Sequence, residues 1–335
     1  MQRIAVIGAG AWGTALALAA RRTGREVAIW AREATVVESI NTQHLNPLFL
    51  PGVDLDPGIE ATGTLALAVA GADAILLVTP AQHLRAMTAE LAPHLPAGAP
   101  AVICAKGIEA GTGALMTEVA AETMPKVPVA VLSGPSFAAE VARAKPTAVT
   151  LACADQDLGA HLADALGTPY FRLYLSDDPL GAQFGGAVKN VIAIACGVAM
   201  GREMGDNARA ALLTRGAGEI TRLALAMGAR AETMMGLSGL GDLALTCCGP
   251  QSRNFTLGVE LGQGRTLADI MAERRSVAEG VHTAASVLAL ARRHGVEMPI
   301  SAAVDAVVNH GADLDETIRA LLARPTDIEA PWARD

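Results

Sequence analysis

The first half of the chain alternates short apolar runs with segments of helical spacing. Apolar runs of strand length occupy residues 3–7, 26–31, 73–79, 101–105 and 127–132, with two further candidates at 148–152 and 170–175. Segments with apolar residues three and four positions apart lie between them, at 11–22, 33–41, 81–95 and 115–124. Continuous apolar runs suit strands that are buried on both faces of a parallel sheet. The alternation predicts an α/β fold with a doubly wound, mostly parallel sheet.

The pattern changes after residue 177. Almost every later segment has helical spacing, at residues 179–202, 207–227, 255–262, 266–274, 280–294, 300–310 and 313–323. We therefore expect two domains, an α/β domain over residues 1–177 and an all-helical domain over residues 178–335.

Composition excludes several classes of function. Hydrophobic residues make up 51% of the 335 residues and charged residues 18%, which is enough to bury large cores. The net charge is −8 and no basic run occurs, which argues against nucleic-acid binding. No apolar run is long and uninterrupted enough to predict a membrane span. The five cysteines are an odd number without a C-x-x-C pair, so we expect a reducing, cytoplasmic location.

A glycine motif follows the first predicted strand and opens the first predicted helix. Residues 8–13 read GAGAWG, with glycines at Gly8, Gly10 and Gly13. In a dinucleotide-binding turn these glycines permit the tight turn, the close approach of a pyrophosphate and the packing of helix on strand. The motif and its βαβ context predict a Rossmann-like dinucleotide site, with a plain tight turn as the alternative.

The end of the second predicted strand bears on the choice of cofactor. An acidic residue at this point bonds the ribose of NAD, but Ala31 stands there and Arg32 follows. An arginine pairs well with the 2′-phosphate of NADP. Because Glu33 is adjacent, NADH remains the alternative to the expected NADPH. A solvated arginine is the simpler interpretation of Arg32.

Two further motifs follow predicted strands, at the edge where ligands bind in such sheets. Lys106 ends the strand at 101–105, where its ammonium would suit an oxyanion or phosphate. Gly134 and Ser136 belong to a turn after the strand at 127–132 and precede a helix start. A surface lysine and an ordinary helix cap are the structural alternatives.

The segment 185–197 predicts a helix that is apolar on nearly all sides and therefore buried. Lys189 and Asn190 lie in its middle. A buried ammonium must be paired or have a lowered pKa, and a lowered pKa suits a general acid or base. A lysine that extends to the surface is the alternative.

Two later motifs would complete an anion site. Asp242 ends the segment GLSGLGD at 236–242 and would pair with a catalytic lysine. Ser252, Arg253 and Asn254 open a predicted helix, whose N-terminus favours an anion. Helix capping is again the simpler alternative.

These motifs, taken in order, resemble NAD(P)-dependent glycerol-3-phosphate dehydrogenase of the bacterial type. The matching segments are GAGAWG at 8–13, NPLFLPGV at 46–53, AKG at 105–107, SGPSFAAE at 133–140, GAVKNVIAIACG at 186–197, GLSGLGD at 236–242, SRN at 252–254 and VAEGV at 277–281. The resemblance covers roughly residues 2–320. The glycine motif is common to many families, whereas the lysine-asparagine helix with the GLGD and SRN segments is specific.

The resemblance implies reversible reduction of dihydroxyacetone phosphate to sn-glycerol 3-phosphate for phospholipid synthesis, without a metal. It implies that Lys189 donates and accepts the proton, aided by Lys106 and Asp242. Implied substrate contacts are Lys106, Gly134, Ser136, Lys189, Asn190, Asp242, Ser252, Arg253 and Asn254. Implied cofactor contacts are Gly8, Gly10, Trp12, Gly13, Arg32, Lys106, Ala138, Arg253, Val277 and Glu279.

Two other functions stay open from the sequence. One is a different dehydrogenase of the same architecture, acting on another small phosphorylated or β-hydroxy acid substrate. The other is a non-enzymatic sensor that binds NADPH. The sequence also leaves the oligomeric state open, with a homodimer among the options.

Overall fold

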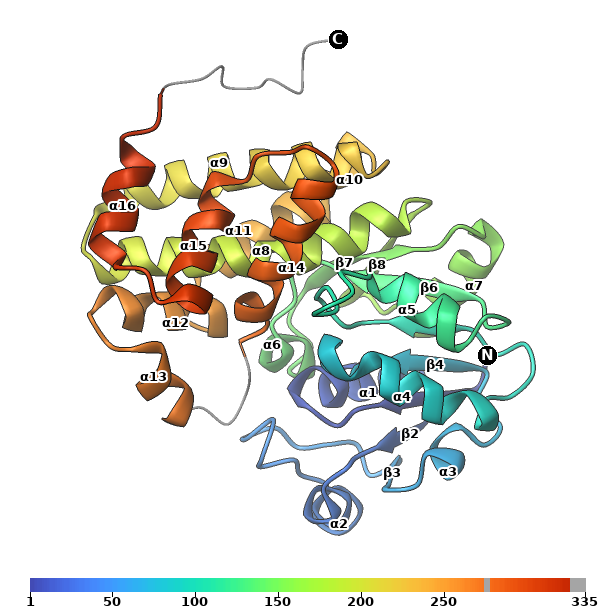
Figure 1. Cartoon of the computed structure of the whole chain (residues 1–335). Coiled ribbons are helices and arrows are strands. Elements are labelled where there is room, and N and C mark those ends of the chain that lie inside the picture. The colour runs from blue at the N-terminus through green and yellow to red at the C-terminus, as the bar shows by residue number, and fades with distance from the viewer. Residues whose placement is uncertain (274–277, 326–335) are drawn as a thin grey trace. The chain divides into compact units, whose positions relative to one another are not determined.

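The computed structural model describes residues 1–273 and 278–325, which form two compact units (Figure 1). Unit 1 comprises residues 1–106 and 115–183. Unit 2 comprises residues 107–114 and the chain from residue 184 onward. The short segment 107–114 thus leaves the α/β unit and packs with the helices, a placement that the local sequence pattern does not reveal.

Unit 1 is built on an eight-stranded sheet. Its strands are β1 (Arg3–Ile7), β2 (Glu26–Trp30), β3 (Ile59–Thr62), β4 (Ala74–Leu77), β5 (Ala101–Ile103), β6 (Val129–Ser133), β7 (Thr147–Ala152) and β8 (Phe171–Ser176). The strand order is β3-β2-β1-β4-β5-β6-β7-β8, and every neighbouring pair is parallel except β6 and β7. The order reverses between β1 and β4, where such sheets hold ligands outside the strands' carboxyl ends. The predicted doubly wound sheet is confirmed.

The helices of unit 1 pack in two groups. They are α1 (Ala11–Arg22), α2 (Ala34–Gln43), α3 (Leu65–Val69), α4 (Leu84–Leu91), α5 (Met116–Thr123), α6 (Ala138–Ala142) and α7 (Gln156–Leu166), with 3-10 turns η1 (Ala81–His83) and η2 (Ala92–His94). Helix α1 contacts α6 and α7, and α4 contacts α5. Alternate side chains of the strands, such as Ile4 and Val6, form one buried core with α1 and α7.

Apart from the segment 107–114, the described part of unit 2 is helical, as predicted. Its elements are α8 (Pro179–Gly201), α9 (Gly205–Ala226), α10 (Ala231–Met235), the π-helical turn η3 (Leu237–Gly241), α11 (Asp242–Cys248), α12 (Arg253–Gly262), α13 (Leu267–Glu273), α14 (Glu279–Arg293), α15 (Pro299–His310) and α16 (Leu314–Leu322). The sequence pattern did not reveal β3, α3 or α7, nor the helical structure over 231–248, and it indicated α6 only as a helix start after Ser136. Most of these elements are short or glycine-rich, so few apolar positions report their period.

Helix α8 is long and apolar enough to cross a membrane, but 78% of its most apolar stretch is buried inside the protein. That burial is typical of a core helix. Glycines allow α12 to pack directly on it, because a Cβ at Gly197 would overlap the Phe255 carbonyl oxygen and one at Gly258 would overlap that of Ile194. This close backbone approach brings polar side chains of α8 and α12 together.

Candidate functional site

The glycine turn after β1 has the geometry of a dinucleotide cradle. Gly8 has a φ of +118°, and a Cβ there would lie 3.1 Å from the Val78 carbonyl carbon at the end of β4. A Cβ at Gly13 would overlap the carbonyl oxygen of Gly8. A Cβ at Gly10, by contrast, would meet no atom within 4 Å. The first two glycines therefore serve the turn and the packing, while Gly10 leaves space beside the backbone for a ligand.

A buried asparagine that the sequence analysis left without a role holds this turn. Asn46 is fully buried, and its Nδ2 donates to the carbonyl oxygen of Ala9 at 2.9 Å and to Thr14 Oγ1 at 2.8 Å. Thr14 also donates to the Ala9 carbonyl oxygen, at 3.3 Å. The signal available in the sequence was the polar residue at the head of the apolar segment 46–53.

The N-terminus of α1 keeps its backbone N–H groups for a ligand. Gly10 stands at the N-cap without a side chain to cap it, and the first turn carries no acidic residue. Trp12 packs edge-on against Phe171, with ring centroids 6.3 Å apart. Its Nε1 is buried and has no hydrogen-bond partner among the described residues. Free donors at a helix N-terminus suit a pyrophosphate, so the residues present fit a dinucleotide.

Beyond β2, the chain exposes the arginine that the sequence singles out. Ala31 is buried, whereas the side chain of Arg32 is 78% exposed. The guanidinium of Arg32 donates to Oε1 of Glu33 from Nε at 3.2 Å and from a terminal nitrogen at 3.0 Å. A 2′-phosphate at this point would compete with Glu33 for the same guanidinium.

At the carboxyl ends of β5 and β6, three of the predicted residues meet. Lys106 Nζ donates to the Gly134 carbonyl oxygen at 2.9 Å, and Ser136 Oγ donates to the same oxygen at 3.0 Å. Gly134 has a φ of +144°, and a Cβ there would lie 2.9 Å from Val149 Cα, so the turn requires glycine.

The same edge of the sheet carries two buried hydroxyls that the sequence analysis missed. Thr79 Oγ1, just beyond β4, and Ser133 Oγ, at the end of β6, have no hydrogen-bond partner among the described residues. Polar residues that directly follow apolar strands were the signal that could have identified them.

Three predicted cofactor contacts lie at or near helix starts, and the structure describes two of them. Ala138 begins the short helix α6, and Glu279 begins α14 in a half-buried position. Val277 lies outside the described residues.

In unit 2, the buried lysine has a partner. Lys189 Nζ donates to Oδ1 of Asp242, and the two side chains are 8% and 1% exposed. Asp242 begins α11 directly after the π-helical turn, and Thr246 Oγ1 donates to its carbonyl oxygen at 2.6 Å. A buried ammonium requires such a partner, so the paired alternative predicted for Lys189 is confirmed. The lysine does not extend to the surface.

The asparagines beside this pair form a second buried set of hydrogen bonds. Asn254 Nδ2 donates to Oδ1 of Asn190 at 3.0 Å, and the backbone N–H of Gly280 donates to Oδ1 of Asn254 at 3.0 Å. Three helices, α8, α12 and α14, are therefore joined one residue away from Lys189.

The remaining predicted anion ligands open α12. Ser252 is the N-cap, and its Oγ accepts from the N–H of Phe255 at 3.2 Å, which is the capping role named as the simpler alternative. Arg253, the next residue, is exposed. Unit 2 thus gathers a buried ammonium–carboxylate pair, polar amides and an arginine, a set able to move a proton and bind an anion.

Known proteins match this chain over nearly its whole length. A glycerol-3-phosphate dehydrogenase [NAD(P)+] of Parvibaculum lavamentivorans is 59% identical, covering 97% of each chain. Another, from Rhodospirillum rubrum, is 60% identical over 98% of this chain and 94% of its own. The crystal structure of glycerol-3-phosphate dehydrogenase from Coxiella burnetii superimposes with a TM-score of 0.92 at 37% identity, covering 96% of this chain and 99% of its own.

Two family models divide the chain between them. The model of the NAD-dependent glycerol-3-phosphate dehydrogenase N-terminus matches residues 3–159, and that of the C-terminus matches residues 178–319. With these matches and the geometry of both units, the chain belongs to the NAD-dependent glycerol-3-phosphate dehydrogenase family.

Proposed function

We propose that this protein catalyses the reversible, NAD(P)H-dependent reduction of dihydroxyacetone phosphate to sn-glycerol 3-phosphate, which supplies the backbone of glycerophospholipids. The observation that carries the proposal is the buried pair of Lys189 and Asp242. An ammonium held inside a helical core is costly, and proton transfer to a substrate oxygen explains its presence. Membership of the family supports the same reaction.

Most of the assigned cofactor contacts belong to unit 1, with the pyrophosphate at Gly8, Gly10 and Gly13 and the start of α1. When bound, the nicotinamide supplies the hydride for the carbonyl carbon. Trp12 Nε1 offers a further donor. Arg32 makes NADPH the preferred cofactor, because its guanidinium matches a 2′-phosphate better than a ribose hydroxyl. NADH remains usable, since Glu33 lies beside it.

Proton transfer and phosphate binding are assigned to unit 2. Lys189 protonates the oxygen that becomes the product hydroxyl, and Asp242 holds the ammonium in place and offsets its burial. Arg253, at the start of α12, binds the substrate phosphate together with the helix N-terminus that Ser252 and Asn254 shape. Binding energy from the phosphate positions the distant carbonyl group.

Lys106 is assigned to electrostatic stabilisation of the oxygen that gains charge during reduction. Its hydrogen bond to the Gly134 carbonyl fixes the direction of the side chain. Ser136 is a further substrate contact, and Ala138, Val277 and Glu279 are further cofactor contacts. On this assignment residues 1–177 form the dinucleotide-binding domain and residues 178–335 the substrate domain.

The proposed chemistry requires no metal ion and no residue from a second chain, so it does not depend on whether the protein is a homodimer. We place the enzyme in the cytoplasm, because its five cysteines are free thiols, four of them buried. The cofactor and the phosphorylated substrate are also soluble metabolites.

The test is oxidation of NADPH by the purified protein, followed by absorbance, with dihydroxyacetone phosphate as substrate. We expect turnover with this substrate and very little with unphosphorylated dihydroxyacetone or with β-hydroxy acids in the reverse direction. Cofactor binding without any turnover would instead identify a sensor. Faster turnover of another substrate in the panel would identify a different dehydrogenase of the same architecture.

A further inference from the structure

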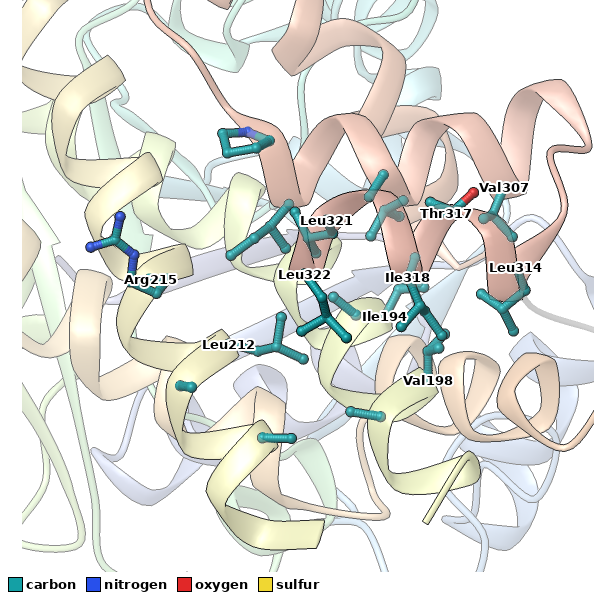
Figure 2. A pocket seen from close by; sticks show the side chains of 18 of the residues that line it. Ile194, Val198, Leu212, Arg215, Val307, Leu314, Thr317, Ile318, Leu321 and Leu322 are labelled. Carbon is teal, nitrogen blue, oxygen red and sulfur yellow. The ribbon is translucent and has the colours of Figure 1, made fainter. Parts of the chain in front are cut away.

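Unit 2 contains an apolar cavity that the proposed reaction does not use. Its volume is about 510 Å³, and helices α8, α9, α15 and α16 line it (Figure 2). Its wall is mostly aliphatic, with Val198, Leu212, Val307 and Ile318 among the side chains that face it. Among the residues that the structure describes, none of the proposed catalytic, substrate or cofactor residues lines it. A cavity of this size and lining is typical of a site for a small apolar ligand.

Helix α16 covers the cavity but contributes no buried side chain to a hydrophobic core. Leu314, Ile318 and Leu321 lie along its cavity side, yet no residue of α16 is fully buried. Leu322, which also lines the cavity, is 71% exposed. An amphipathic helix is normally stabilised by burying its apolar stripe. A ligand in the cavity would bury the stripe of α16.

Positive charge is placed at one end of this apolar space. Arg215, Arg222 and Arg324 line the cavity. Arg222 donates to the Glu297 carbonyl oxygen at 3.3 Å, and Arg324 pairs with the Glu297 carboxylate at 2.8 Å. Arg215 is exposed and has no hydrogen-bond or ion-pair partner among the described residues. Figure 2 shows Arg215 at one end and Leu314 and Val198 at the other.

The acidic side chain in the cavity lining, Glu219, is engaged mainly by groups other than the three arginines. Glu219 is 1% exposed, and its carboxylate accepts hydrogen bonds from the N–H groups of Ile300 and Ser301 at 2.6 and 3.1 Å. It also accepts from Ser301 Oγ at 3.0 Å. The carboxylate therefore serves the N-terminus of α15 and also attracts Arg222, so Arg215 is the arginine left suited to an anion.

We propose that this cavity binds a single-chain anionic amphiphile, with one long acyl chain along the aliphatic wall and a phosphate head group at Arg215 and its neighbours. The planar guanidinium group is well matched to phosphate oxygens. Met204, the N-cap of α9, and Arg215 both line the cavity and are eleven positions apart, a helical rise of about 16 Å that suits an extended chain. The class we assign is an acyl ester of glycerol phosphate, which is the enzyme's product after acylation. That choice of head group rests on the proposed function.

The shape of the site favours this ligand over a second copy of the chain. Helices α8, α9, α15 and α16, with Leu261 of α12, line a hollow of about 510 Å³, whereas a face that docks another protein needs a broad exposed surface. The charge is also gathered at one end, as an amphiphile requires.

The test is titration of the full-length protein with 1-oleoyl-glycerol 3-phosphate below its micelle concentration, followed by calorimetry. Oleate and neutral 1-oleoylglycerol serve as comparison ligands. We expect one phosphate amphiphile per chain, with at least tenfold weaker binding of the neutral ligand and weaker binding of oleate. Hydrogen exchange of the α16 amides should slow when the amphiphile is bound, because α16 gains buried contacts.

Variants locate the site. Ala208 lines the cavity and is half-buried, so Ala208→Trp should fill the space and weaken binding at least tenfold. Ala210→Trp, at an exposed position of the same helix outside the cavity, is the matched control. Arg215→Gln should weaken the phosphate ligand severalfold and leave the neutral ligand unchanged. Arg319→Gln, on α16 but outside the cavity lining, should change neither.

Several results would overturn the proposal. They are absence of binding, equal affinity for the neutral ligand, equal or tighter binding of oleate, or full binding by a folded Ala208→Trp protein. A ligand-free dimer that Ala208→Trp dissociates would show instead that a second copy covers this face. Turnover of dihydroxyacetone phosphate is measured separately. Its absence, with amphiphile binding intact, would overturn the proposed function but not this site.

Discussion

The side-chain amide of Asn254 donates a hydrogen bond of 3.0 Å to Oδ1 of Asn190, the residue that follows Lys189 on α8. The carbonyl oxygen of the same amide accepts from the backbone N–H of Gly280 at 3.0 Å. Both polar atoms of Asn254 are therefore engaged inside unit 2. The geometry gives Asn254 a positioning role between three helices, in addition to any contact with phosphate.

The first prediction concerns Gly280. A Cβ at this position would lie 2.7 Å from the Asn190 carbonyl oxygen and 2.8 Å from Asn254 Oδ1. Gly280→Ala should push α14 from the two asparagines and lower the free energy of unfolding by about 1–3 kcal/mol. Urea unfolding measures this loss. Ala285→Ser, at an exposed position of the same helix, adds one atom without crowding and should leave stability unchanged.

The second prediction concerns the proton. General acid–base help is worth about 10²–10⁴-fold, so Lys189→Met should lower kcat by at least that factor. NADPH should still bind, as measured by fluorescence titration, because Lys189 is not among the assigned cofactor contacts. Near-normal kcat with an unchanged pH profile would mean that another group transfers the proton.

Lys106→Met serves as the comparison for that experiment. Lys106 is half-buried and bonded to the Gly134 carbonyl, and its assigned role is electrostatic. Its loss should therefore lower kcat and raise the KM for dihydroxyacetone phosphate together. An effect confined to kcat would assign Lys106 to proton transfer instead.

The third prediction concerns recognition of the substrate phosphate. Arg253→Ala should strongly reduce turnover of dihydroxyacetone phosphate, because a charge-assisted contact at the α12 N-terminus is lost. Unphosphorylated dihydroxyacetone should be a poor substrate for the unmodified protein and lose little further activity. Steady-state kinetics with both substrates measures the difference. Equal losses on the two would point to a structural or cofactor-binding role.

The fourth prediction concerns the choice of cofactor. Arg32→Ala should raise the KM for NADPH more than that for NADH, by a factor equivalent to about 1.5–3 kcal/mol. Glu33→Gln is the second variant to measure, because it removes the carboxylate that Arg32 now contacts. In that variant the KM for NADPH should fall relative to the KM for NADH. Equal changes in both KM values for Arg32→Ala would exclude recognition of the 2′-phosphate.

The fifth prediction concerns pH and stability. Burial raises the pKa of the Glu219 carboxyl to about 7 from 4.5, although its hydrogen bonds to Ile300 and Ser301 favour the ionised form. A raised pKa means that the folded protein binds the proton more tightly than the unfolded chain. Glu219 therefore contributes at most about 3 kcal/mol to the free energy of unfolding through this proton. This stabilisation is complete below about pH 4.5 and is lost as the pH rises through 7.

Unfolding free energies at pH 5, 6, 7 and 8 test this sign. The difference in stability between the unmodified protein and Glu219→Gln should shrink or reverse as the pH rises. Glu90→Gln, at an exposed position of α4, should show no such trend. A difference that grows with pH would contradict the assignment.

The sequence alone determined the features that depend on local pattern. Apolar runs and helical spacing identified most strands of the sheet and the change to helices near residue 177, because burial imposes the period of each element. The glycines at 8 and 13 were informative because only glycine meets the steric demands of the turn and the packing, and Gly10 leaves space for a ligand. Lys189 was conspicuous because an ammonium in an apolar helix requires an explanation.

Only the tertiary structure decided which distant residues meet. The pairing of Lys189 with Asp242, and of Asn190 with Asn254, depends on helices that approach over glycine surfaces, and no local period encodes such contacts. The same is true of Asn46, whose bonds to the glycine turn span more than thirty residues of chain. The cavity beneath α16 is likewise a property of four packed helices, each of which reads in sequence as an ordinary amphipathic or apolar segment. The shape of the cavity and the pairing of side chains arise from packing between segments far apart in the chain. The sequence pattern of each element reflects only which of its own faces is buried.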